Sequence, residues 1–431
     1  MDNAEKTPNR WLIAIMGTLL QLCLGTVYAW SYFQKPLVDT YGWSNTHVAW
    51  AFSLAICSLG LAAAFGGMRL PKTGPRVLAV TGGLLFGLGY LLAAAALHFR
   101  SLTALYLGYG VVGGIGLGLG YVTPVATVAK WFPDKKGLVT GMVIMGFGFG
   151  ALLMSKVVAP VLMGLCHGNL VHVFAYTGVT FLVLPAAFAA FLRNPPPGYS
   201  VAGGAATAPV ARTPTQAAPG AAAHFMSGRF LIMWAVFFCN ILAGISIIGF
   251  QSPLFQDLWK RIDPSLSPAA LAGLGATLIA VSSLFNGLGR LLWGGLSDRI
   301  GRSLTFRIML ASQAFAFALL MLAGNPWVFG ALICYVLLCY GGGFGTMPSF
   351  VLDVFGPKQM AVIYGTILTA WSAAGIAGPQ LVAWLKDRYG AGASSYAFLT
   401  GLIFLAAGFV LACGLHDARH ESGRETDRRT A

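Results

Sequence analysis

The chain has 431 residues, of which 57% are hydrophobic and only 9% are charged, and its mean hydropathy is +0.74. Soluble domains carry about 25% charged residues, so this chain cannot cover its apolar side chains with a water-facing surface. The 56 glycines have no three-residue period, which excludes collagen. The seven cysteines form no CxxC pair, so we expect neither a disulfide framework nor a metal site. The composition predicts an all-α polytopic membrane protein without a cofactor.

Apolar stretches of about 20 residues are long enough to cross a bilayer as helices, and the chain contains twelve of them. In chain order the predicted spans are 11–33, 47–69, 77–98, 102–130, 137–163, 171–193, 229–255, 270–296, 303–324, 327–352, 359–385 and 394–416. The first span is too long for the apolar region of a secretory signal, so we expect no cleaved leader.

The positions of the basic residues predict the orientation of these spans. With the N-terminus inside, 19 of the 27 Lys and Arg residues fall in cytoplasmic segments. Seven lie outside or near the outer face: Lys35, Arg100, Lys156, Lys260, Arg261, Lys386 and Arg388. Cytoplasmic loops are enriched in Lys and Arg, so both termini are expected in the cytoplasm of a plasma (cell inner) membrane protein. The net charge of +14 then reflects topology and lipid contact, and we expect no nucleic-acid partner.

The spans divide into two halves. Residues 194–228 begin with three prolines and continue as a Gly, Ala, Thr and Pro run, which is typical of a flexible connector. We therefore expect a six-helix bundle over 1–193, a cytoplasmic linker over 194–228, a second six-helix bundle over 229–416 and a cytoplasmic tail over 417–431.

The two halves also repeat one another weakly. Pro124, Pro133 and Gly141 recur 224 residues later as Pro348, Pro357 and Gly365, and Arg10 and Gly25 recur 219 residues later as Arg229 and Gly244. Weak internal symmetry of this kind is typical of transporters whose halves rock about a central site.

Two sets of motifs carry a family resemblance over essentially the whole chain. The run Gly294-Gly295-Leu296-Ser297-Asp298-Arg299-Ile300-Gly301-Arg302 resembles the signature loop of the major facilitator superfamily. Its N-terminal copy, 66–76, has Pro71 where Asp298 stands, so a carboxylate-based gating lock is not expected there. Residues 131–137 (WFPDKKG), Phe285-Asn286-Gly287 with Arg290, and Pro348-Ser349 with Asp353 resemble the branch that holds oxalate:formate antiporters and the monocarboxylate (lactate and pyruvate) transporters. The resemblance implies transport of small carboxylates, by exchange or with a proton.

Arg290 is the charge that a structural role explains least well. It lies six residues before Leu296, where the eighth span is expected to end, and deeper if the helix continues. A cation at that depth costs a few kcal/mol unless it snorkels to the headgroups or finds a partner. Ser282, Asn286 and Arg290 recur every four residues and form one polar stripe, which favours a cavity over snorkelling. A guanidinium binds a carboxylate through two parallel hydrogen bonds.

The acidic residues point the same way, because none of the thirteen falls in the middle of a span. Arg290 then lacks an internal counter-ion, which favours an anionic substrate. In the carboxylate transporters an acid often precedes the arginine by one turn, where this chain has Asn286, and oxalate exchangers carry a lysine where this chain has Trp371. One fixed positive charge suits a monoanion better than a dianion, so we favour lactate or pyruvate over oxalate.

Aromatic residues supply the remaining candidates for the pocket lining. Tyr121 is expected to donate its hydroxyl to the carboxylate, and Tyr340 and Phe344 are expected to line the apolar side of the pocket. Tyr28, Trp30, Phe147 and Trp371 are further candidates, although aromatic residues in membrane spans more often pack or face lipid.

The leading hypothesis is a monomeric, proton-coupled symporter for small monocarboxylates that works by alternating access. Asp257, near the outer end of the seventh span, is the candidate proton carrier, or else an ordinary solvated acid. A carboxylate exchanger of the oxalate:formate type is the alternative. An enzyme would need a catalytic constellation within the spans, and the sequence offers none. The glycine-rich run 113–120 has no preceding strand, so it predicts close helix packing and not a nucleotide-binding loop.

Overall fold

A computed structural model of the chain describes residues 9–132, 136–196, 199 and 227–415. Regular structure within these ranges is helical throughout, and no strand occurs in them. Most of the expected linker 194–228 and the whole expected tail 417–431 lie outside the described residues.

Six crossings come from the first half of the chain. Their helices are α1 (Arg10–Leu24), η1 (Gly25–Ala29), α2 (Trp30–Tyr41), α3 (Asn45–Thr73), α4 (Pro75–His98), α5 (Leu102–Leu105), η2 (Tyr106–Gly113), α6 (Gly114–Trp131), α7 (Lys136–Leu153), η3 (Met154–Val158), α8 (Ala159–Leu165) and α9 (Leu170–Ala189). Elements η2 and η3 are π-helical insertions within single crossings.

The second half supplies the other six crossings. Its helices are α11 (Gly228–Ile262), α12 (Pro268–Ile300), α13 (Arg302–Leu322), α14 (Pro326–Ile367), α15 (Thr369–Tyr389), η4 (Gly390–Gly392) and α16 (Ala393–Cys413). Helix α14 contains a kink at Gly356, where φ is 76° and ψ is 169°. The kink separates the tenth crossing from the start of the eleventh.

Local sequence explains where most crossings begin and end. Asn or Ser side chains cap the N-termini of several helices, as Ser44 does for α3 by accepting from the amide of His47 at 3.1 Å. Proline, which has no amide hydrogen to leave unpaired, opens α4, α12 and α14. Gly42 and Gly301 end α2 and α12 at φ values of 70° and 93°, which side chains rarely adopt.

Eleven helical segments of the described chain are long and apolar enough to span a membrane. The remaining predicted span, 359–385, coincides with the end of α14 and with α15. The last turn of α15 is polar because it carries Lys386, Asp387 and Arg388. The expectation of twelve crossings in an all-α membrane protein is therefore confirmed.

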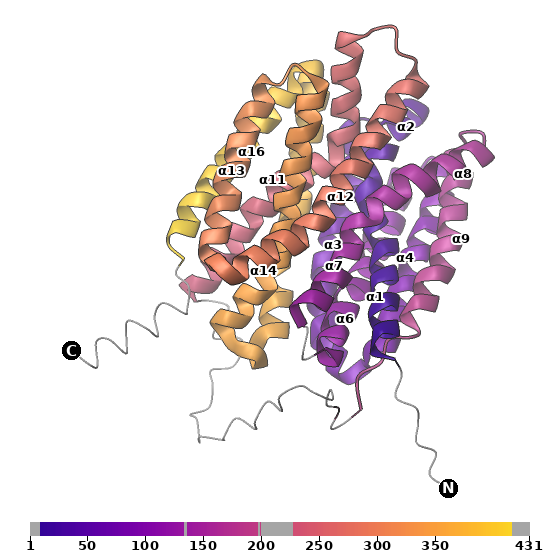
Figure 1. The fold of residues 1–431 in the computed structure, drawn as a ribbon. Helices are drawn as coiled ribbons and strands as arrows, with labels where there is room; N and C mark the ends of the chain where they lie inside the picture. The colour runs from indigo at the N-terminus through magenta and orange to yellow at the C-terminus, as the bar shows by residue number, and fades with distance from the viewer. Residues whose placement is uncertain (1–8, 133–135, 197–198, 200–226, 416–431) are drawn as a thin grey trace.

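The crossings form two bundles that pack side by side (Figure 1). Helices α1 to α9 pack mainly on one another, as do α11 to α16, and the bundles meet where α3 contacts α15 and α7 contacts α12. The start of α1 and the end of α16 lie at the same end of the bundles, which we call the terminal face, and the opposite end is the distal face (Figure 1).

Glycines allow the helices to approach closely. A Cβ on Gly114 would lie 2.6 Å from the carbonyl oxygen of Ala55, and one on Gly82 would lie 2.6 Å from the amide nitrogen of Gly120. The expectation that the run 113–120 serves helix packing is thereby confirmed. Across the bundles, a Cβ on Gly148 of α7 would lie 2.5 Å from Cα of Gly287 on α12.

Hydrogen bonds between the bundles gather from mid-depth to the distal face. At the distal face Asp387 of α15 accepts from the amides of Asn45 and Thr46 at 3.0 and 2.8 Å, and from their side chains at 3.0 and 2.6 Å. Nearer the middle, Ser372 donates to the carbonyl of Cys57 at 2.8 Å. We call the contact of Asp387 with Asn45 and Thr46 the distal latch, because it holds the start of α3 against the end of α15.

Candidate functional site

Arg290 lies deep in the protein, and no acidic residue of the described chain pairs with its charge. Helix α12 runs on to Ile300, ten residues beyond Arg290, so the residue lies about 15 Å from that end of the helix. Its side chain is 1% exposed, and all three guanidinium nitrogens lack a hydrogen-bond partner. The side chain is therefore enclosed by protein, and the alternative that it snorkels to the surface does not describe this structure.

Two aromatic rings replace an acidic partner. The guanidinium carbon lies 5.0 Å from the centre of the Phe344 ring and 5.6 Å from that of Phe147. Each such contact is worth about 0.5–2 kcal/mol, which offsets part of the cost of a cation buried in a membrane protein. Ring faces attract the charge without using its N–H donors. The donors thus remain available to an anion.

The backbone around Arg290 is held by close packing of α12 on α14. A Cβ on Gly345 would lie 2.9 Å from the carbonyl carbon of Arg290, so α14 reaches this position only because residue 345 has no side chain. Along the predicted polar stripe, Ser282 donates to the side chain of Gln251 at 2.7 Å, whereas the amide oxygen of Asn286 has no partner. The stripe is buried, and its unsatisfied atoms lie nearest Arg290.

Six of the predicted aromatic residues meet around Arg290 and form what we call the aromatic cluster. Its members are Tyr28, Tyr121, Phe147, Tyr340, Phe344 and Trp371, each at most 2% exposed. Neighbouring ring centres lie 4.7–6.3 Å apart, from Phe344 with Trp371 to Tyr28 with Trp371. The cluster draws on both bundles, so it lies where the halves meet.

Some polar groups of the cluster are hydrogen-bonded and others are not. Tyr28 and Tyr340 hydrogen-bond each other at 2.7 Å across the bundles. The Tyr121 hydroxyl and the indole N–H of Trp371 are buried and have no partner. Gln21 holds Tyr121 in place by donating to its carbonyl oxygen at 3.0 Å. Several unpaired donors thus adjoin the cation of Arg290.

Two candidates from the sequence lie away from this cluster. Trp30 packs within the first bundle on Tyr109, with ring centres 4.7 Å apart. Asp257 accepts an ion pair from Lys386 at 2.7 Å, where the distal ends of α11 and α15 meet. Asp257 is therefore not among the groups gathered at Arg290.

Sequence reasoning missed two buried polar residues. Tyr364 has an unpaired hydroxyl and lies within electrostatic range of Arg290 and Tyr121. Asn240 of α11 has both side-chain polar atoms unpaired and faces Gly343 of α14. An asparagine in the middle of an apolar span is a signal that could have identified Asn240, and spacing by seven from Trp371, two helical turns, could have identified Tyr364.

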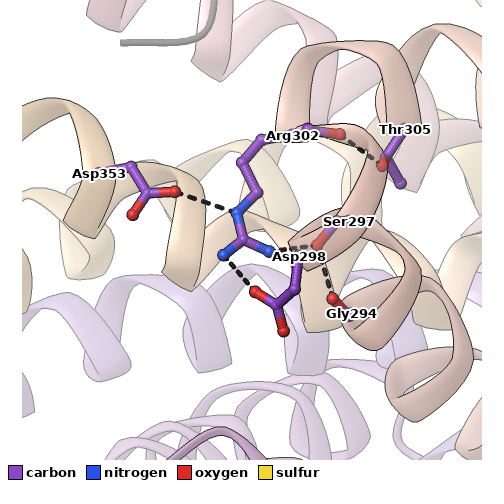
Figure 2. Close-up of polar contacts among 7 residues, drawn as sticks. Gly294, Ser297, Asp298, Arg302, Thr305 and Asp353 are labelled. Carbon is purple, nitrogen blue, oxygen red and sulfur yellow. Dashed lines mark hydrogen bonds and ion pairs between the residues drawn. The ribbon is translucent and has the colours of Figure 1, made fainter. Parts of the chain in front are cut away.

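The signature loop forms a charged cluster at the terminal face (Figure 2). Arg302 donates to Asp353 at 3.1 Å and to Asp298 at 2.5 Å, and it also contacts the hydroxyl of Ser297. Gly301 makes the turn that brings Arg302 back over the end of α12. We call Arg302, Asp298 and Asp353 the terminal clamp. Gly294 accepts from Ser297 at 2.6 Å, and Arg299 lies in the last turn of α12.

Among the described residues of the first bundle, no ion pair takes the place of this clamp. When Gly74, with φ of 80°, is matched with Gly301, Pro71 takes the place of Asp298 and Pro75 that of Arg302. Arg76 instead donates to the carbonyl oxygen of Ala190 at 2.6 Å. The two copies of the loop therefore fasten their bundles by different chemistry.

The described carboxylates lie away from Arg290. The described acids lie at helix ends, and four of them, Asp257, Asp298, Asp353 and Asp387, take part in the pair with Lys386, the terminal clamp or the distal latch. Within the described ranges no group of three His, Cys, Asp or Glu residues is arranged to hold a metal ion. The arrangement around Arg290 suits a small anion with an apolar body.

Known proteins resemble this chain along most of its length. The sequence profile of the Major Facilitator Superfamily matches residues 11–379. The oxalate:formate antiporter of Oxalobacter formigenes is 28% identical over 407 residues, which cover 94% of this chain and 91% of that protein. Apicoplast pyruvate carrier 1 of Toxoplasma gondii is 27% identical, with 85% and 82% covered, and monocarboxylate transporter 11 of Mus musculus is 26% identical, with 94% and 87% covered.

A solved structure shares the fold at low sequence identity. A bacterial homologue of the human lysosomal transporter Spinster, in an inward-facing and unoccupied conformation, superposes with a TM-score of 0.69 at 14% identity. The match covers 94% of this chain and 96% of that one.

Proposed function

This chain belongs to the major facilitator superfamily, and from that premise we propose that it is a secondary active transporter of small monocarboxylates of the L-lactate and pyruvate class. Its relatives are transporters and not enzymes. In the proposed mechanism the carboxylate binds Arg290 between the bundles, which then rock to expose it on the other side. We further propose one bundle over 1–193, a linker over 194–228 and a second bundle over 229–416, in a monomer whose termini lie in the cytoplasm at a plasma membrane.

One observation carries the substrate proposal: the guanidinium of Arg290 is buried and has no hydrogen-bond partner. A buried donor left unpaired costs about 1–3 kcal/mol, and a carboxylate would relieve that cost through two parallel hydrogen bonds. The aromatic cluster offers apolar walls for a short carbon chain. A single fixed cation, with Trp371 in place of a second, supports a monoanion over a dianion.

Proton coupling is the finer part of the proposal. Arginine does not deprotonate in proteins, so Arg290 cannot carry the proton. We propose that Asp257, paired with Lys386, is the carboxylate that does so, or that the proton travels with the substrate itself. If Asp257 is the carrier, its replacement by Asn would abolish accumulation driven by a pH gradient while leaving exchange of lactate intact.

Carboxylate exchange is the alternative. It is supported by the 28% identity to the oxalate:formate antiporter of Oxalobacter formigenes over 94% of this chain. Exchange requires a preloaded counter-substrate, whereas symport does not. The two modes are therefore separable in one vesicle assay.

The test is uptake of radiolabelled L-lactate into proteoliposomes, with and without an acidic exterior, for wild type and Arg290→Ala. Arg388→Ala removes an exposed arginine from the distal end of α15 and is the matched control. We expect gradient-driven accumulation in wild type and control, and background uptake in Arg290→Ala. Uptake only after preloading with another carboxylate would favour the exchanger, and no carboxylate flux in either mode would refute the substrate proposal.

A further inference from the structure

Two tyrosine hydroxyls from opposite bundles lie within electrostatic range of Arg290 and make no regular hydrogen bond with the described residues. Tyr121 belongs to α6 of the first bundle and Tyr364 to the eleventh crossing of the second, and they are 1% and 5% exposed. Neither hydroxyl makes a hydrogen bond of regular geometry. The two are nevertheless close enough to interact with each other, and Tyr121 is close enough to interact with Arg290. A buried hydroxyl without a partner is uncommon in proteins and calls for an explanation such as an absent ligand.

The two tyrosines differ in position from the pair that is already satisfied. Tyr340, which bonds Tyr28, lies 14 residues, or about 21 Å, from the distal start of α14 at Pro326. Tyr364 lies eight residues, or about 12 Å, beyond the kink at Gly356 near the terminal face. The bonded pair, Tyr28 with Tyr340, is therefore separate from Tyr121 and Tyr364, and all four hydroxyls lie within electrostatic range of Arg290.

The chemistry of a carboxylate matches what these groups lack. Each carboxylate oxygen accepts two hydrogen bonds. A bidentate guanidinium uses one acceptor position on each oxygen, and one position on each remains. Tyr121 and Tyr364 each offer one O–H donor, and both lie within electrostatic range of Arg290. The two tyrosine O–H donors therefore match the two acceptor positions that remain on the carboxylate.

We propose that Tyr364 binds the substrate carboxylate, and that with Tyr121 it clamps this group between the bundles. The inference rests on the proposed function and names a residue that sequence reasoning did not select. Because Tyr121 and Tyr364 belong to different bundles, the bound carboxylate satisfies donors of both at once. Binding is then strongest in the state in which the bundles hold Tyr121 and Tyr364 close together, which supplies the differential affinity that a ligand needs to shift a conformational equilibrium.

The experiment measures dissociation constants of acetate, L-lactate and pyruvate for the full-length protein by calorimetry. Tyr364→Phe removes only the hydroxyl, and we expect all three ligands to weaken by a similar factor of about ten, equivalent to 1.4 kcal/mol. The similar factor is the diagnostic sign, because the three ligands share only the carboxylate. Tyr90→Phe, which changes a buried tyrosine packed on Phe86 and Phe181 of the first bundle, should bind all three as wild type does.

Two further variants separate a binding role from a structural one. Tyr364→His restores an N–H donor and should recover part of the lost affinity. In Tyr121→Phe with Tyr364→Phe, the losses should be less than additive if both donors act on one carboxylate that holds them together. Thermal unfolding of each ligand-free variant establishes that it is folded.

The outcomes distinguish this inference from the proposed function. Unchanged affinities in Tyr364→Phe, with wild-type binding intact, would overturn the clamp and leave monocarboxylate binding by Arg290 standing. A loss confined to one ligand would also overturn it, since the hydroxyl would then recognise the carbon chain. Absence of binding of all three monocarboxylates to wild type would overturn the proposed function and the clamp together.

Discussion

At the scale of single residues, the environment of Arg290 stabilises a buried cation without using its hydrogen-bond donors. Phe147 and Phe344 present ring faces to the guanidinium and leave its five N–H donors unused. An acidic neighbour would stabilise the charge more strongly but would occupy the same donors. Aromatic neighbours thus stabilise the charge less than an acid would, and they leave its donors free for the carboxylate that we propose as substrate.

The unused donors of Arg290 predict the effect of Asn286→Asp, one turn before Arg290. An acid four residues before an arginine on a helix pairs with it, so at neutral pH the new carboxylate would compete with the substrate. We expect lactate affinity to fall about tenfold or more at pH 7.5. The loss should persist down to pH 5, because pairing with Arg290 keeps the new carboxylate ionised.

The measurement is the lactate dissociation constant of the variant relative to wild type between pH 5 and 8. Asn286→Ala, which adds no charge, is the control and should lose much less affinity than Asn286→Asp. A loss in Asn286→Asp no larger than that in Asn286→Ala would contradict competition by the new carboxylate.

At the scale of secondary-structure elements, the distal latch joins the end of one helix to the start of another. Asp387 accepts hydrogen bonds from two backbone amides in the first turn of α3. Amides in the first turn of a helix have no acceptor within that helix. A carboxylate at a helix N-terminus is also favoured by the helix dipole. The latch therefore stabilises contact between the bundles at the distal face, and it must break before that face can open.

The pH dependence of the latch follows from the pKa of Asp387. Partial burial raises this pKa, but hydrogen bonds from Thr46 and Asn45 outweigh burial and lower it below the ordinary carboxylate value. A lowered pKa in the closed state means that the latch contributes fully above the ordinary value of about 3.9 and is lost only as the pH falls through the lowered one. The latch should therefore be insensitive to pH between 5 and 8.

We accordingly predict that Asp387→Asn opens the distal face to a similar extent at pH 5 and at pH 8. Spin labels on the distal ends of α3 and α15 would report the change as a longer distance distribution, with Asp263→Asn as a control at an exposed turn. The pH profile of lactate transport should keep its shape. A profile that flattens in Asp387→Asn would instead identify this carboxylate as part of proton coupling.

At the scale of the whole molecule, the two halves repeat one fold but are fastened differently. The second bundle has the terminal clamp, whereas the first has Pro71 and Pro75 at two of the matching positions. The three residues of the terminal clamp differ in the exposed fraction of their side chains, which is 9% for Arg302, 30% for Asp353 and 64% for Asp298. Exposed ion pairs contribute little, whereas loss of a buried partner costs more.

We therefore predict that Arg302→Ala destabilises the protein by about 1–3 kcal/mol, that Asp353→Asn costs less, and that Asp298→Asn costs least. Thermal unfolding in detergent would rank the three variants. Arg76→Ala should have a separate effect that adds to that of Arg302→Ala, since Arg76 bonds within the first bundle and Arg302 within the second. Equal losses for Asp298→Asn and Asp353→Asn would contradict the ranking.

Much of this architecture could be predicted from composition and spacing. Apolar runs locate the crossings because a bilayer imposes one length on all of them, and Arg290 is conspicuous because a charge inside such a run is rare. The sequence offers Phe147 and Trp371 only as further candidates, and the structure shows that they meet at Arg290. Tyr364 escapes sequence reasoning because its role depends on the contact of two bundles, and the distal latch does so because Asp387 resembles an ordinary charge at a helix end.

The kink at Gly356 has a mechanical consequence. The tenth and eleventh crossings are two helices that meet at that residue, where the backbone adopts a φ of 76° that favours glycine. The direction of the eleventh crossing relative to the tenth is thus set largely by the two dihedral angles of one residue. Rotation about these two angles would move Tyr364 and Trp371 together relative to Tyr340 and Phe344. A small torsion at the surface would in this way reshape the walls around the buried arginine.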